Sequence, residues 1–380
     1  MRMHRWKIII IPVLLLFAIS CSQLNKATDL ITNPTAKERY KRDLKISDEL
    51  FLIWENQGNL ALQDSVKIKT PYFQEGHFKP KTFPFLSFDL ELTVGEKMDI
   101  TVEADSTFTL LFIDLLFQEN DTLRAFKNVA ISNFGSKKLS EEIEESGTYK
   151  VVIQPEINAS TAFSLKIVTT PVYEFPVAGA GNTNIQSFWG ANRDAGRRSH
   201  EGIDIFAARG TPVIAVTNGQ ITSSGERGLG GKQVWLRDQK RNQSLYYAHL
   251  DSIMPLANNR VKTGDTIGFV GNTGNAKTTA PHLHFGIYKG YRGAIDPLSH
   301  VFQIAKIEFK PTAGVPNNLN FVTRAVANLR DLPATNGSGI IANLRANDTL
   351  VMLGRTNDWY HIRTVNRQAG FIHESLVGPL

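Results

Sequence analysis

The stretch Thr278–Tyr288, TTAPHLHFGIY, places two histidines one residue apart between apolar neighbours. In an extended strand, residues two apart point to the same face and lie about 6.6 Å apart along the chain. His282 and His284 then share one face, while Leu283 and Phe285 point into a core. Taken alone, the pattern fits either a metal or catalytic site or two separate histidines, each hydrogen-bonded in a packed environment.

Two other segments carry side chains that can bind a metal. His200 opens the run HEGIDIFAARGTPVIAV, in which Asp204 follows four residues later. This even spacing puts both on one face of a strand, which the β-branched, Gly-Pro-containing sequence after them favours over a helix. A third alternating run, QSLYYAHL, is expected to place Leu245, Tyr247 and His249 on one side. Such convergence on strand faces is what a zinc site on a rigid sheet requires.

The five candidate residues are His200, Asp204, His249, His282 and His284. Catalytic zinc sites use three protein ligands and leave a position for water, whereas structural sites use four, often cysteines. Three ligands would leave two histidines, and an imidazole with a pKa near ~6.5 can move protons at neutral pH. An aspartate ligand also suits zinc better than calcium, which takes six or more oxygens. A structural zinc with four ligands, His249 included, stays open as an alternative.

Three motifs carry a family resemblance: the H-x-x-x-D of His200 and Asp204, the Y-A-H-L that contains His249, and the P-H-L-H-F of residues 281–285. They resemble the lysostaphin-type zinc metallopeptidases, endopeptidases that cut peptidoglycan peptides. The connecting segments ARGTPVIAVTNGQI and VKTGDTIGFVGNTGNAKTTAPHLHFGI resemble that family too, in the same order.

The resemblance implies a role for each candidate residue. His200, Asp204 and His284 would bind Zn²⁺, and His249 and His282 would be the catalytic pair that activates water and stabilises the tetrahedral intermediate. The implied function is hydrolysis of amide bonds in peptidoglycan peptides during cell-wall remodelling. The alternative is a non-catalytic wall-associated lipoprotein that activates other hydrolases. Family members of that kind have usually lost ligands, whereas all five positions are present here.

The start of the chain resembles a bacterial lipoprotein signal peptide. A basic beginning, MRMHRWK, precedes an apolar run from Ile8 to Ala18 that is shorter than the roughly 20 residues of a membrane-spanning helix. Cys21 follows directly after AIS, as in a lipobox, where the cysteine becomes the lipidated first residue. We therefore expect an exported, membrane-anchored lipoprotein of the bacterial cell envelope. Ordinary signal cleavage, with Cys21 incidental, is the alternative.

Composition limits the other functions. The formal net charge of +6 includes three basic residues of the signal and falls to +3 after cleavage. A charge this small, without a basic stripe interleaved with aromatic residues, gives no indication of nucleic-acid binding. Cys21 is the only cysteine, so none remains for a disulfide or a thiol nucleophile.

The chain as a whole is predicted to be mainly β and multidomain. Period-two runs such as FLSFDLELTV and TYKVVIQPE, divided by turn residues, predict an antiparallel β-sandwich, jelly-roll-like and similar to pre-peptidase domains. The last sixty or so residues resemble a bacterial SH3-like barrel through NLR (328–330), DWY (358–360) and GFIH (370–373). The predicted units are a signal peptide (1–20), a tether with short helices (21–65), the β-sandwich (66–171), a central antiparallel-sheet zinc metallopeptidase domain (180–302), a linker (303–318) and the SH3-like barrel (319–380).

The helical segment and the sandwich upstream of the metallopeptidase domain raise a further hypothesis. They would hold the enzyme latent by blocking its cleft until a regulatory protein partner moves them.

Overall fold

The computed structural model describes residues 29, 31–80, 82, 84–106, 108–120, 125–193, 196–255, 259–305, 307, 309 and 319–380. The predicted signal peptide and Cys21 lie outside these residues, as does most of the predicted linker. Strands dominate the described chain and pair in antiparallel sheets, which confirms the predicted fold class. None of the described helices has the length and apolar character needed to cross a membrane.

In the described part of the chain, helices α3 (Ala36–Asp43) and α4 (Asp48–Leu60) and the short 3₁₀ helix η1 (Ala61–Gln63) lie before the strands. Thr35 and Glu38 form a capping box at the start of α3, and Ser47 caps α4. On α4, Trp54 is fully buried and its Nε1 donates to the carbonyl of Pro155 at 2.8 Å. This contact fixes α4 to the β-sandwich.

The sandwich consists of two four-stranded antiparallel layers whose apolar faces meet. One layer has the order β2 (Leu86–Leu92), β7 (Gly147–Pro155), β4 (Leu111–Asn120), β5 (Ala125–Ile131). The other has the order β1 (Tyr72–Phe78), β8 (Thr161–Pro171), β3 (Glu96–Ala104), β6 (Lys138–Glu142). Inward-facing residues such as Phe88, Ile100 and Leu165 are fully buried between the layers, as period-two patterning requires.

The central part of the chain is built on a second sheet, of eight strands, with its own core. Its order is β18 (Arg260–Val261), β14 (Gly219–Arg227), β15 (Gly231–Asp238), β16 (Gln243–Leu250), β20 (His282–Tyr288), β12 (Ile203–Phe206), β9 (Ile185–Ser187), with β21 (Ala294–Ile295) on β20. Three further sets of elements complete this part among the described residues. They are a three-stranded sheet of β13 (Pro212–Ile214), β19 (Thr266–Phe269) and β17 (Ser252–Ile253), the hairpin of β10 (Asn192–Arg193) and β11 (Arg198–Ser199), and helix α5 (Leu298–Val301) with four 3₁₀ turns, including η4 (Gly228–Gly230) and η5 (Gly274–Ala276).

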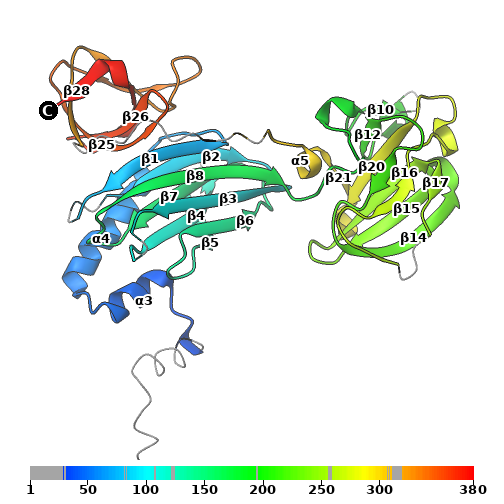
Figure 1. Cartoon of the computed structure of the whole chain (residues 1–380), viewed down its shortest axis with the longest axis horizontal. Helices are drawn as coiled ribbons and strands as arrows, with labels where there is room; N and C mark the ends of the chain where they lie inside the picture. Colours follow the sequence, from blue (N-terminus) through cyan, green and yellow to red (C-terminus); the bar gives the residue numbers. More distant parts are fainter. Residues whose placement is uncertain are drawn as a thin grey trace, which may run out of the picture.

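The C-terminal barrel is joined to the sandwich. Its strands are β22 (Asn320–Thr323), β23 (Ala327–Arg330), β24 (Ile340–Leu344), β25 (Thr349–Thr356), β26 (Trp359–Thr364), β27 (Ala369–His373) and β28 (Val377–Pro379). Strand β25 pairs with β1, so the barrel and one sandwich layer form a single eleven-stranded sheet. Phe371 and Leu353 of the barrel belong to the sandwich core. Figure 1 shows the barrel on the sandwich and the central part of the chain at the other end.

A charged contact connects the sandwich to the central part of the chain. Nε and Nη2 of Arg241 donate to the two carboxylate oxygens of Glu142, each at 2.8 Å. Nη1 of the same arginine pairs with Asp238. A guanidinium that makes two parallel hydrogen bonds to one carboxylate fixes orientation as well as distance.

Candidate metal centre

Three neighbouring strands position the five predicted site residues. Strand β20 lies between β12 and β16, and its register pairs Asp204 with His284 and Phe206 with His282. Leu283 and Phe285 alternate with the histidines and are fully buried in the core. The alternation predicted from TTAPHLHFGIY is therefore present, and the buried residues anchor the strand that carries both histidines.

His249 reaches the same place by a different route from the one its sequence indicates. Leu245 and Tyr247 are fully buried in the core, so strict alternation would put His249 there too. The register between β15 and β16 instead shifts by one residue between Tyr247 and Leu250, and His249 has a left-handed φ of 63°. This β-bulge turns His249 to the face that carries Ala248, and the expectation that it shares a side with Leu245 and Tyr247 is wrong.

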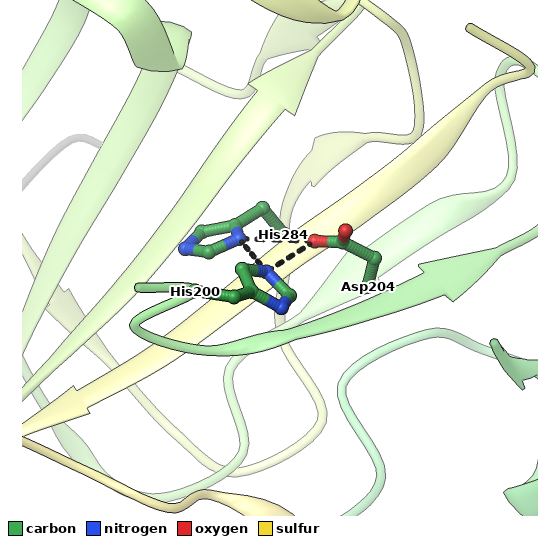
Figure 2. Close-up of side chains that lie close together, drawn as sticks. All are labelled: His200, Asp204 and His284. Carbon is green, nitrogen blue, oxygen red and sulfur yellow. Dashed lines mark hydrogen bonds and ion pairs between the residues drawn. The ribbon is translucent and has the colours of Figure 1, made fainter. Parts of the chain in front are cut away.

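Three of the five residues converge on one point (Figure 2). His200 Nε2, His284 Nδ1 and Asp204 Oδ1 lie 3.0 Å from one another in each pair. His200 Nδ1 donates to the carbonyl of Phe188 at 2.8 Å, so in the neutral ring Nε2 directs a lone pair at the cluster. Two imidazole nitrogens and a carboxylate oxygen this close to one another need a shared proton or a cation between them. Their separations suit ligands about 2.0–2.2 Å from a shared zinc ion.

The charges of this cluster suit metal binding. Burial would raise the pKa of Asp204, but hydrogen bonds and charge from His200 and His284 hold it well below its usual range. Burial lowers the pKa of His284, against the opposing effect of its hydrogen bond to Asp204. Asp204 is therefore held as a carboxylate, and burial disfavours the charged form of His284. A carboxylate and a neutral imidazole are the forms that bind metal.

The other two histidines lie beside this cluster and are held in one orientation. His249 Nδ1 donates to the carbonyl of Thr273 and His282 Nδ1 to that of Ala280, each at 2.9 Å. Each ring is left with Nε2 as the nitrogen that can accept a proton. The rings of His249 and His282 are 5.1 Å apart between centroids, and His249 is 5.9 Å from His284. Burial, followed by the charges of His284 and His282, lowers the pKa of His249 to about 4. It is a neutral proton acceptor at pH 7.

All five residues line one open cleft of about 760 Å³. Every described residue that lines it lies between Gln186 and Tyr288, with Leu229 and Tyr246 among them. Within the described ranges 29–171 and 319–380, no residue contributes to this lining. The described structure therefore does not show the blocked cleft of the hypothetical latent form.

Comparison with known proteins agrees with this geometry. Residues 198–297 match the family described as peptidase family M23, and residues 325–378 match the bacterial SH3 domain. The chain contains a peptidase family M23 domain. The M23 match includes all five site residues, and the second match confirms the SH3-like resemblance of the C-terminal barrel.

Relatives of the M23 domain include named endopeptidases. The L-Ala--D-Glu endopeptidase of Bacillus subtilis is 33% identical over 149 residues, which cover 36% of this chain and 45% of that protein. The DD-carboxypeptidase/endopeptidase Mpg of Neisseria meningitidis is 35% identical over 138 residues, which cover 36% of this chain and 31% of that protein. Among solved structures, the catalytic domain of lysostaphin from Staphylococcus simulans is 32% identical and covers 30% of this chain and 91% of that one, with a TM-score of 0.28. The chain thus spans less than half the length of these two curated relatives.

Proposed function

We propose that the protein is a zinc metalloendopeptidase of the bacterial cell envelope that hydrolyses amide bonds in peptidoglycan peptides. The observation that carries this proposal is the pair of oriented histidines beside a three-residue metal-binding group in an open cleft. The M23 domain and its endopeptidase relatives support the same reaction class.

The metal would be held by His200, Asp204 and His284. When bound, it supplies a Lewis acid that polarises the scissile carbonyl and activates water. His249, neutral at pH 7, is placed to accept the proton of the attacking water through Nε2. His282, held by the Ala280 carbonyl, is placed to donate a hydrogen bond to the developing oxyanion when protonated.

A structural zinc with His249 as fourth ligand is the competing assignment. Among the described residues, the group whose ligand atoms lie close together contains His200, Asp204 and His284 but not His249. Three ligands leave the metal accessible from the cleft, as a catalytic site requires. The geometry therefore favours the catalytic assignment.

Digestion of purified peptidoglycan by the protein tests the proposal, with and without a chelator, followed by mass analysis of the released peptides. Cleavage that the chelator abolishes and added Zn²⁺ restores is the expected result, and the new termini identify the bond. A folded protein that binds one zinc but releases no peptide would contradict the proposal. That result would favour the non-catalytic activator.

We also propose that the protein is anchored to a membrane through a lipid on Cys21. The lipobox-like sequence before Cys21 supports this proposal. The wild-type chain should appear in the membrane fraction with a lipid-modified peptide that starts at residue 21, whereas Cys21→Ser should not be lipidated. Equal membrane association and mass for the two chains would refute the anchor.

A further inference from the structure

Arg193 contacts the carboxylate of Asp204 on the oxygen that does not face the other two metal-binding residues. Arg193 Nη2 donates to Asp204 Oδ2 at 2.6 Å, while Oδ1 is the oxygen 3.0 Å from His200 Nε2 and His284 Nδ1. The arginine therefore does not occupy the position where a metal would bind. An ion on Oδ1 and the guanidinium on Oδ2 can be present together.

The position of Arg193 is fixed by the strands around it. It lies on β10 of the β10–β11 hairpin, and its Nη2 also donates to Ser187 Oγ on β9 at 2.6 Å. Ser187 is the register partner of Asp204 across β9 and β12. The two hydrogens of Nη2 thus each have an acceptor, one on each strand. Ser187 Oγ in turn lies 3.4 Å from His200 Nδ1, so one polar network reaches two of the three metal-binding residues.

We propose that Arg193 is a positioning residue for the metal site, which holds Asp204 as a ligand through Oδ1 alone. This inference rests on the proposed zinc site. The torsion that rotates a carboxylate is broad, so Asp204 without a partner on Oδ2 would sample orientations that turn Oδ1 away. Groups that orient metal ligands in this way typically change metal affinity by about 10- to 100-fold.

The charge of Arg193 has the opposite effect on Zn²⁺ affinity. The positive guanidinium repels a metal ion, so removing it should make metal binding tighter. The side chain of Arg193 is about one-third exposed (34%), so solvent screens that repulsion. Orientation should therefore outweigh charge. Arg197 on the same hairpin offers a matched control, because it has the same charge but no hydrogen bond or ion pair to Asp204 in the described structure.

The test compares wild type, Arg193→Met, Arg193→Lys and Arg197→Met as full chains. Their Zn²⁺ affinity is measured by competition with a chromophoric chelator, and Co²⁺ loaded in place of zinc reports ligand geometry through its visible absorption. Arg193→Met should bind Zn²⁺ about 10- to 100-fold more weakly and change the Co²⁺ spectrum. Arg193→Lys, which keeps the charge but has one donor nitrogen in place of three, should lie between Arg193→Met and wild type. Arg197→Met should bind at least as tightly as wild type.

Arg193→Met binding as tightly as wild type, with an unchanged Co²⁺ spectrum, would overturn the proposal. Circular dichroism of the metal-free chains establishes folding. Should Arg193→Met not fold, the same Zn²⁺ and Co²⁺ measurements on Arg193→Lys and Ser187→Ala test the proposal. Each of these variants weakens the hydrogen-bond network while keeping the arginine or its charge. Neither readout depends on hydrolysis, so the inference can fail while the proposed function stands. A wild-type chain that binds no Zn²⁺ would contradict both the role of Arg193 and the proposed zinc-dependent function.

Discussion

His249 combines a left-handed backbone with a buried imidazole whose pKa is lowered to about 4. A non-glycine residue in this region of φ is strained, and such residues cluster at active sites. The strained backbone of His249 belongs to the β-bulge, which turns this side chain out of the core and places it beside His284. We therefore expect its side chain to matter for turnover and not for metal binding.

Replacement of His249 by Ala should lower kcat by about 10²- to 10⁴-fold, because in the proposed mechanism it removes a proton acceptor without removing a metal ligand. Zinc content, measured by elemental analysis, should stay at one ion per chain. His373→Ala, in the C-terminal barrel, is the control and should retain full activity. Loss of zinc together with activity would instead identify His249 as a fourth ligand.

His361, in the C-terminal barrel, should make folding stability depend on pH. It is completely buried, and burial lowers its pKa to about 3, with the charge of Arg363 acting in the same direction. In the unfolded chain a histidine titrates near ~6.5, so between that pH and about 3 the unfolded state binds more protons than the folded state. Folding stability should therefore fall as the pH decreases from ~6.5.

Denaturant unfolding at pH 7 and pH 5 checks this sign. Wild type should lose roughly 1–2 kcal/mol between the two values for each fully buried neutral histidine. His361→Leu should lose less than wild type over the same interval, because it has no proton to bind at this position. Equal losses would show that His361 does not contribute.

At the scale of elements, two glycine turns form one wall of the cleft. Gly231 and Gly274 have φ of 60° and 69°, and a Cβ on Gly274 would come 2.2 Å from the carbonyl oxygen of Leu229. Only residues without side chains permit η4 and η5 to approach this closely. The cleft wall therefore depends on the glycine backbone.

Gly274→Ala should destabilise the M23 domain by about 1–3 kcal/mol and reduce activity, because it adds a backbone clash to a strained φ. Gly264→Ala is the matched control. Its φ of 91° is also positive, but a Cβ there meets nothing within 4 Å. Thermal unfolding should show a smaller loss for Gly264→Ala, and equal losses would mean that the contact between η4 and η5 is unimportant.

At the scale of the whole molecule, the sandwich and the barrel form one unit, and the M23 domain projects from the other end (Figure 1). Besides the shared sheet, Arg363 of the barrel pairs with the buried Asp64 at 2.9 Å. His361 packs 5.3 Å from Phe88 between ring centroids and hydrogen-bonds to Gln74. The barrel therefore covers surface that the sandwich would otherwise expose.

A chain that ends at residue 305 should lose stability in the sandwich while keeping the metal site. Calorimetry should show a lower unfolding temperature for the sandwich transition, because apolar surface and the Asp64 carboxylate lose their partners. Zn²⁺ binding should be unchanged, since every described residue that lines the cleft lies between Gln186 and Tyr288, before the point of truncation. An unchanged sandwich transition would show that the barrel is an independent module.

Sequence patterns alone were enough to predict the β-rich fold class, the lysostaphin-type and SH3-like resemblances and the five candidate site residues. These depend on local patterns, such as period-two alternation in TTAPHLHFGIY and the spacing of His200 and Asp204. Three features became visible only in the folded chain: the side on which His249 lies, the contact of Arg193 with Asp204, and the sheet that the barrel shares with the sandwich. Each of these depends on pairing between segments far apart in the chain. A bulge is defined only against its neighbouring strand, an ion pair by the approach of two strands, and a shared sheet by the docking of one edge on another.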